Sequence, residues 1–275
     1  MSGPAGPGPR LVGVGVGPGD PDLVTVKAVR VLNEADLVLV PVLAEGPLAD
    51  GPLADGALTG GALTGGSPGT DSGGPGRAEA TVRAHLRHDR IQRVAFALNE
   101  REDQGRRVAA WDAAADAAAA AFRAGAALIA FATIGDPNVY STFTYLASGV
   151  RERVAGLTTA TVPGITAMQD LAARSGTVLC EGRESLALLP LTAGVPAFRA
   201  ALARFDTVVG YKSGRHLPEV LAAVREAGRL DDAVHGASLG LPGEDIRPAA
   251  AMTGPAPYLS TLLVPARRAM RGGKL

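Results

Sequence analysis

The sequence predicts an α/β protein of two domains, because short apolar strand patterns alternate with helical ones, glycine-rich turns separate them, and the length exceeds that of one ordinary domain. The chain has 275 residues, of which 47% are hydrophobic and 4% aromatic. It can therefore bury a large core of small aliphatic side chains. We expect a mainly parallel sheet in the first domain, residues 10–160, and a mixed sheet in the second, residues 161–267.

The first elements form a βαβ unit. Residues 11–16 are an apolar run interrupted by glycine, which predicts a buried strand. A Gly-Pro-Gly-Asp-Pro turn follows at 17–21, and Thr25 is placed to cap a helix that continues to about Ala35. A second apolar strand at 36–42 completes the unit, so we expect these two strands to be parallel.

The segment 45–76 breaks this alternation. Gly-Pro-Leu-Ala-Asp occurs twice in tandem, and Gly-Ala-Leu-Thr-Gly follows twice. This period matches neither the two-residue repeat of a strand nor the repeat of about 3.6 residues of a helix. The segment predicts a flexible surface insertion, with a small lid over an active site as the alternative, and we expect the fold to survive removal of residues 46–66.

The alternation resumes after the insertion. The next elements are a helix at 77–88, a strand at 93–98, an Ala-rich helix at 104–123, a strand at 126–133, a helix at 139–148 and a strand at 159–162. The later part predicts a helix at 165–173, strands at 186–191 and 207–211, a helix at 217–227, and strands at 233–239 and 258–264. The spacing of these late strands indicates some antiparallel pairing.

Composition and charge exclude several classes of protein. The formal net charge is zero, which disfavours nucleic-acid binding. The most apolar stretch is interrupted by charged residues and residues 1–9 lack the features of an export signal, so we expect a soluble, cytoplasmic protein without a membrane partner. Cys180 has no disulfide partner, and we expect it to be a buried, inert thiol. His85 and His88 share a helix face without a third ligand, so no metal site is expected.

The glycines of the first loop do not form a dinucleotide fingerprint. Glycines stand at 13, 15, 17 and 19, but none of them has glycine five residues later. Asp20 and Asp22, at the head of the following helix, would also repel a diphosphate. The ligand of this loop is therefore not expected to be a diphosphate.

A second loop, at 133–142, also contains glycine and joins a predicted strand to a predicted helix. It lies at the carboxyl end of a predicted buried strand, where ligands bind in open α/β sheets. Gly135 permits close approach of the backbone, and Ser141 and Thr142 offer hydroxyls near the free amides of a helix start. From these residues alone, Gly-Asp-Pro is also a common turn.

Four motifs in fixed order resemble the tetrapyrrole methylase family over residues 11–265, apart from the insertion. They are Gly-Val-Gly-Pro-Gly-Asp-Pro at 15–21, Leu-Val-Thr-Val-Lys-Ala at 23–28, Gly-Asp-Pro-Asn-Val-Tyr-Ser-Thr at 135–142 and Val-Pro-Gly-Ile-Thr-Ala at 162–167. Tyr-Ser-Thr at 140–142, Glu-Gly-Arg at 181–183 and Tyr-Leu-Ser-Thr-Leu-Leu at 258–263 resemble its precorrin-2 C20-methyltransferase branch.

This resemblance implies a two-domain class III methyltransferase architecture, a homodimer, and S-adenosylmethionine bound in the cleft between the domains. It implies cofactor contacts at matching positions, namely Pro18, Gly135, Asp136, Val139, Thr142, Thr166, Ala167, Tyr211, Lys212 and Gly240. Many relatives carry an apolar residue where Lys212 stands, so only the backbone of this residue is an expected contact.

The implied reaction is methylation of precorrin-2 at C20, giving precorrin-3A in cobalamin synthesis. Because this tetrapyrrole carries carboxylates, Arg174, Arg183 and Arg215 are candidate substrate ligands. Tyr140 is the candidate catalytic residue, which would orient the substrate or relay a proton, with aromatic packing as its alternative. The alternative functions are a methylase of the cobalt-loaded substrate or of another ring position, and a non-catalytic S-adenosylmethionine-binding protein.

Overall fold

The computed structural model describes residues 8–43, 76–96, 104–270 and 274. These residues form two compact units, one up to Thr166 and the other from Ala167 onward. The division falls later than residue 160, because strand β5 (Thr158–Val162) pairs with β1 (Arg10–Gly15) as part of the first sheet. Apart from Gly76, the insertion expected at 45–76 lies outside the described residues.

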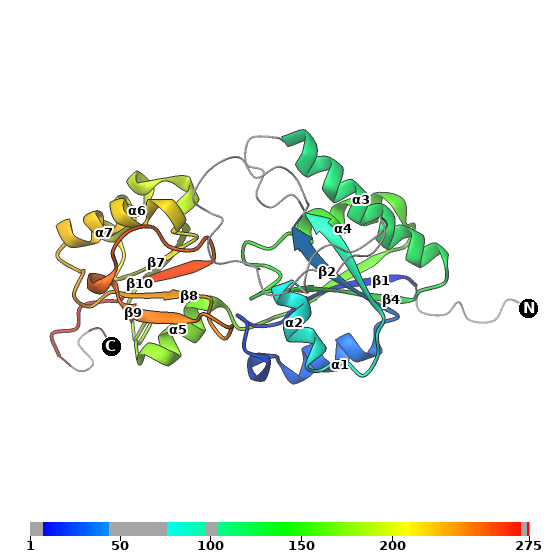
Figure 1. Cartoon of the computed structure of the whole chain (residues 1–275), viewed down its shortest axis with the longest axis horizontal. Coiled ribbons are helices and arrows are strands. Elements are labelled where there is room, and N and C mark those ends of the chain that lie inside the picture. The colour runs from blue at the N-terminus through cyan, green and yellow to red at the C-terminus, as the bar shows by residue number, and fades with distance from the viewer. Residues whose placement is uncertain (1–7, 44–75, 97–103, 271–273, 275) are drawn as a thin grey trace, which may run out of the picture. The chain divides into compact units, whose positions relative to one another are not determined.

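The first unit contains a five-stranded sheet with the order β3-β2-β4-β1-β5. Its other strands are β2 (Leu37–Leu43), β3 (Ile91–Phe96) and β4 (Leu128–Thr133). Three of its strands, β1, β2 and β4, are labelled in Figure 1. Every neighbouring pair is parallel, which confirms the predicted parallel sheet. The carboxyl ends of all five strands therefore lie along one edge.

Helices cover both faces of this sheet, because its strands are apolar on both sides. They are α1 (Val26–Glu34) and α2 (Arg77–Arg83) on one face, and α3 (Gln104–Arg123) and α4 (Phe143–Arg153) on the other. Successive residues of β1 alternate between the two cores: Leu11 packs with α3 and α4, and Val12 packs with α1 and α2. This is the layered arrangement that parallel sheets require.

Helix boundaries show where local chemistry overrides the sequence pattern. The Oγ1 of Thr25 accepts a hydrogen bond from Ala28 N at 3.2 Å and caps α1, as predicted. The helix expected at 139–148 begins only at Phe143, because Tyr140 has a φ of 51°, which is outside the helical region. Helix α2 ends at Arg83 and is shorter than the expected 77–88.

The second unit contains a mixed sheet with the order β6-β7-β10-β8-β9. Its elements are α5 (Ala167–Ser175), β6 (Leu186–Pro190), α6 (Val195–Arg204), β7 (Thr207–Tyr211), α7 (Leu217–Glu226), β8 (Val234–Ala237), β9 (Asp245–Pro248) and β10 (Ser260–Val264). Strands β6 and β7 are parallel, and β10 is antiparallel to both β7 and β8. This confirms the predicted mixed sheet, to which the structure adds α6 and β9.

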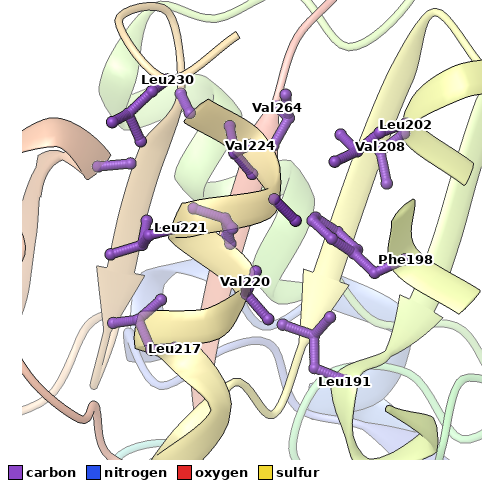
Figure 2. Close-up of a cluster of buried hydrophobic side chains, with 14 of the residues drawn as sticks. Leu191, Phe198, Leu202, Val208, Leu217, Val220, Leu221, Val224, Leu230 and Val264 are labelled. Atoms are coloured by element: carbon purple, nitrogen blue, oxygen red, sulfur yellow. The ribbon is translucent and has the colours of Figure 1, made fainter. Parts of the chain in front are cut away.

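The core of the second unit lies between α6, α7 and one face of this sheet. Figure 2 shows Phe198 of α6, Val220 of α7, Val208 of β7 and Val264 of β10 in one cluster of buried side chains. Helix α5 covers the opposite face, where Leu171 packs with other buried side chains. The second unit therefore has its own two-sided core.

The structure gives the surroundings of Cys180, His85 and His88. Cys180 is exposed, contrary to the expected buried thiol, because it lies in the irregular segment between α5 and β6. His85 Nε2 lies 2.8 Å from Pro21 O, and His88 Nε2 lies 3.1 Å from Leu32 O. Across the described ranges, no group of three His, Cys, Asp or Glu residues could hold a metal ion. Nor does any helix in these ranges combine the length and hydropathy of a membrane crossing.

Candidate functional site

Three loops of the first unit meet at the carboxyl ends of β1, β4 and β5. Gly135 N donates a hydrogen bond to Gly17 O at 2.8 Å, which joins the β1 loop to the β4 loop. A Cβ added to Gly15 would lie 2.5 Å from Gly135 O and 2.6 Å from Gly164 N, closer than real Cβ atoms come. The close approach of three backbones therefore requires glycine at these points.

Asp136 fastens the β4 loop to the β5 loop. Its side chain is buried, its Oδ1 accepts from Asn138 N at 2.8 Å, and its Oδ2 accepts from Gly164 N at 3.0 Å. Bonds of a carboxylate to backbone N–H groups are charge-assisted and strong. Because each oxygen has two lone-pair sites, both can still accept a further donor from a ligand.

The start of α4 is capped by a residue that the sequence prediction did not single out for this role. Ser141 Oγ accepts from Phe143 N at 3.2 Å and donates to Thr133 Oγ1 at 3.1 Å. Thr142 occupies the N-cap position, but its side chain makes no capping hydrogen bond. Ser141 thus anchors the helix to the end of β4, and the Thr142 hydroxyl is not used for capping.

The six cofactor candidates of the first unit all belong to these three loops. They are Pro18 in the β1 loop, Gly135, Asp136, Val139 and Thr142 in the β4 loop, and Thr166 after β5. Pro18 and Thr166 are buried, and Val139 N donates to Asp136 O at 3.2 Å. The structure therefore brings together segments that are far apart in the sequence.

Tyr140 lies in the same β4 loop. Its side chain is 45% exposed, so the ring is not part of the core of the first unit. Partial burial raises the pKa of its phenol, so the hydroxyl stays protonated at neutral pH. A left-handed backbone is unfavourable for a tyrosine, and such strained residues concentrate at functional sites.

The second unit places its candidates at the ends of β7 and β8. Lys212 directly follows β7, and Gly240 lies in the loop between β8 and β9. Because β7 and β8 both run antiparallel to β10, their carboxyl ends lie at the same edge of the sheet. Met168 N donates to Tyr211 Oη at 2.9 Å, which ties the end of β7 to the first turn of α5, where Ala167 stands.

Two non-glycine residues at this edge have left-handed backbones. The φ of Lys212 is 62° and that of Ser238 is 52°. Lys212 N donates to Ser260 O at 2.9 Å, and Lys212 Nζ lies 5.7 Å from the centre of the Tyr258 ring. The lysine side chain is thus engaged in a cation–π contact.

The candidate substrate arginines stand in different settings. Arg174, on α5, forms ion pairs with Asp170 at 2.8 Å and with Glu244 at 2.9 Å. Arg183 is exposed in the segment before β6, and its backbone N donates to Lys274 O at 2.9 Å. The side chain of Arg215 lies outside what the structure describes. The two carboxylates beside Arg174 already balance its charge, so it is poorly suited to bind a further anion.

Comparison with known proteins agrees with the motifs that meet in the first unit. The model of the family described as Tetrapyrrole (Corrin/Porphyrin) Methylases matches residues 10–252. The chain is 30% identical over 233 residues to a precorrin-2 C(20)-methyltransferase of Sinorhizobium sp, with 82% of each chain covered. It is 28% identical over 268 residues to a cobalt-precorrin-2 C(20)-methyltransferase of Salmonella typhimurium, covering 93% of this chain and 95% of that one.

The fold is also similar to that of a solved structure. The uroporphyrin-III C-methyl transferase from Thermus thermophilus, complexed with S-adenyl homocysteine, superposes with a TM-score of 0.56 at 19% identity, over 92% of this chain and 96% of that one. At this identity the likeness supports the architecture alone. With the family match over most of its length, the chain belongs to the tetrapyrrole methylases.

Proposed function

We propose that this chain is an S-adenosylmethionine-dependent methyltransferase of cobalamin synthesis that methylates precorrin-2 at C20 to give precorrin-3A. The observation that carries the proposal is the backbone contact among Gly15, Gly135 and Gly164, because the three loops that meet there hold the family motifs. The similarity to the precorrin-2 C(20)-methyltransferase of Sinorhizobium sp supports the choice of ring position.

The residues of the first unit fit the proposed cofactor. An added Cβ at Gly135 would have no atom within 4 Å, so there is open space beside this backbone. Asp136 keeps acceptor capacity for the hydroxyl or amino groups of a ligand, and the hydroxyl of Thr142 is not used for capping. We propose the same role for the other candidates of both units, Pro18, Val139, Thr166, Ala167, Tyr211, Lys212 and Gly240.

The chemistry asks the protein mainly for orientation. S-adenosylmethionine supplies a methyl group that its sulfonium already activates. The residues of the chain have to hold the reacting groups in line and exclude water, and such orientation is worth about 7–11 kcal/mol. We propose that Tyr140, protonated at neutral pH, donates a hydrogen bond that orients the substrate or helps a proton to leave.

The proposal has three further parts. The similarity to the enzyme of Salmonella typhimurium supports cobalt-precorrin-2 as the alternative substrate. The family resemblance leads us to propose a homodimer. We keep Arg183 and Arg215 as candidate ligands of substrate carboxylates.

The test is a reaction of the purified chain with precorrin-2 and S-adenosylmethionine labelled with ¹³C in the methyl group. We expect a product that is one methyl group heavier and carries the label at C20 by NMR. A parallel reaction with cobalt-precorrin-2 decides the metal state of the substrate. Label at another ring carbon would place the chain in a sister branch, and S-adenosylhomocysteine binding without turnover would indicate a non-catalytic protein.

A matched pair of aspartate variants links this reaction to the loop contacts. Asp136→Asn has a single acceptor oxygen and cannot keep both the bond from Asn138 N and the bond from Gly164 N, so we expect poorer binding of S-adenosylhomocysteine. Asp116→Asn is the control, because Asp116 is an exposed aspartate on α3 that pairs only with Arg153 among the described ion pairs. Equal binding by both variants would remove Asp136 from the proposed site.

A further inference from the structure

A chain of polar contacts runs from α5 to the loop between β8 and β9. Arg174 Nε donates to Asp170 Oδ1 at 2.8 Å, and Arg174 Nη1 donates to Glu244 Oε1 at 2.9 Å. The other oxygen of Glu244, Oε2, accepts from Gly240 N at 2.6 Å. Every bond in this series involves a charged group and is therefore stronger than a bond between neutral groups.

The loop at the end of this series has an unusual backbone. Ser238, Gly240 and Gly243 have φ values of 52°, 69° and 83°. Inside the loop, Leu241 N donates to Ser238 O at 3.0 Å, and Glu244 N donates to Leu241 O at 3.0 Å. A left-handed serine persists only where its surroundings fix it, and the Glu244 side chain provides a tie from the loop to α5.

Asp170 shows that this series is retained at a cost in stability. The residue is 5% exposed, and its Oδ2 is buried without a hydrogen-bond partner in the described part of the chain. A buried, unsatisfied carboxylate oxygen is destabilising and calls for an explanation. Orientation of the planar guanidinium of Arg174, whose donors point in fixed directions, supplies one.

We propose that Arg174 is a positioning residue for cofactor binding, which acts through Glu244 on Gly240 and does not bind substrate carboxylates. This inference rests on the proposed function, because Gly240 is one of the proposed cofactor contacts. It also specifies that contact: the N–H of Gly240 is occupied by Glu244, so a ligand meets the carbonyl or Cα of this glycine.

The test measures S-adenosylhomocysteine binding to the full chain by calorimetry, together with separate KM values for S-adenosylmethionine and the tetrapyrrole. We expect Arg174→Met and Glu244→Gln each to weaken binding about tenfold and to raise the KM for S-adenosylmethionine equally. The kcat and the KM for the tetrapyrrole should stay within about twofold. Arg199→Met is the control, because Arg199 forms an exposed ion pair with Glu226 in the same unit.

The double variant tests whether Arg174 and Glu244 act in series. We expect Arg174→Met with Glu244→Gln to bind S-adenosylhomocysteine no worse than either single variant, because groups in one network are not additive. Arg174→Lys keeps the charge but not the two-sided donor geometry, so it should restore only part of the affinity. If the losses of affinity in the two single variants added up fully in the double variant, the proposed action of Arg174 through Glu244 would be overturned.

Three other outcomes also bear on the proposed role of Arg174. A raised KM for the tetrapyrrole in Arg174→Met, with unchanged S-adenosylhomocysteine binding, would make Arg174 a substrate ligand and overturn the proposal. If Arg174→Met does not fold, the nearly isosteric Glu244→Gln tests the proposal instead. Unchanged affinity of this folded variant for S-adenosylhomocysteine would overturn it. If the unaltered chain binds no S-adenosylhomocysteine, the proposed function itself fails, and this inference fails with it.

Discussion

The two units build their candidate binding edges in different ways. In the first unit, three loops approach so closely that Gly15 and Gly164 leave no room for a Cβ. In the second unit, Lys212 and Ser238 hold left-handed backbones despite their side chains, and the Glu244 carboxylate ties the β8–β9 loop to α5. We therefore expect the binding edge of the first unit to be most sensitive to substitutions that add atoms. The binding edge of the second unit should be most sensitive to substitutions that remove side-chain atoms.

The largest expected effect comes from Gly164→Ala. The new Cβ would overlap Gly135 O and lie 2.8 Å from Gly15 Cα. Because both obstacles are backbone atoms, the loops cannot adjust cheaply, and we expect a loss of about 3 kcal/mol or more in the free energy of unfolding. Urea denaturation followed by circular dichroism measures this loss.

Two glycine variants serve as controls for this result. Gly8→Ala places a Cβ 3.6 Å from Gly156 O, an ordinary contact, so its effect should stay within about 0.5 kcal/mol. Gly135→Ala meets no atom within 4 Å, but its φ of 71° costs about 1–2 kcal/mol for alanine. If all three variants were equally stable, steric exclusion would not explain the glycines of the first edge.

The second unit should respond to the loss of a buried side chain, Arg229. This arginine is 8% exposed and donates hydrogen bonds only to backbone carbonyls in the described contacts, those of Leu202, Phe205, Asp206, Val264 and Pro265. Arg229→Met leaves these carbonyls at the ends of α6 and β10 without their donor. We expect a loss of about 3 kcal/mol in the free energy of unfolding.

The exposed Arg199 again provides the comparison for Arg229. Arg199→Met removes a surface ion pair and should cost at most about 1 kcal/mol. Thermal unfolding of both variants under the same conditions tests the difference. A similar melting temperature for the two would show that the carbonyl cluster does not depend on Arg229.

Acid should destabilise the second unit through His235. The side chain is fully buried on β8, and neither ring nitrogen has a hydrogen-bond partner within the described ranges. Burial lowers the pKa of His235 from 6.5 to about 4, against a raising effect of Asp245 and with a further lowering by Arg247. The folded state thus favours the neutral ring, whereas the unfolded chain takes up a proton near pH 6.5.

The sign of the effect follows from this order of pKa values. The stability is fully present above pH 6.5, falls as the pH decreases, and is lost in full, by about 3 kcal/mol, below about pH 4. At pH 5 the loss is about 2 kcal/mol. Urea titrations at pH 7.5 and pH 5 measure it, and His235→Leu should abolish this part of the difference. An unchanged pH dependence in His235→Leu would assign the acid sensitivity to other groups.

The fold of the first unit could largely be predicted from sequence. Its strands are apolar on both faces, and turn residues mark their ends, so the parallel alternation was visible in the pattern. The meeting of the loops at 15–21, 135–142 and 162–167 then followed from topology, because the carboxyl ends of parallel strands share one edge.

The second unit was less predictable, for two physical reasons. Strand β9 has four residues, Asp245–Pro248, and is too short and polar to show a period. Helix α6 was missed although Pro196 in its first turn is a helix-start signal. The relay from Arg174 to Glu244 joins residues 70 positions apart, so no local pattern announces it. Arg174 was therefore interpreted as a substrate ligand rather than as a loop support.

The smallest expected effect on stability is that of Tyr140→Phe, which tests the chemistry at the binding edge of the first unit without disturbing its packing. Tyr140 is 45% exposed and belongs to neither core, so Tyr140→Phe should leave the free energy of unfolding within about 0.5 kcal/mol. Loss of one hydrogen bond to the reacting substrate costs about 1.4 kcal/mol, which corresponds to about a tenfold lower kcat.

Binding and turnover of Tyr140→Phe must therefore be measured separately. We expect unchanged affinity for S-adenosylhomocysteine by calorimetry and reduced turnover in the labelled-methyl assay. Tyr145→Phe is the control, because Tyr145 is also about half exposed but stacks on Trp111 on the α3–α4 surface. Equal turnover by both variants would show that the Tyr140 hydroxyl has no part in the reaction. The left-handed backbone of Tyr140 would then serve only to place Ser141 and Thr142 at the start of α4.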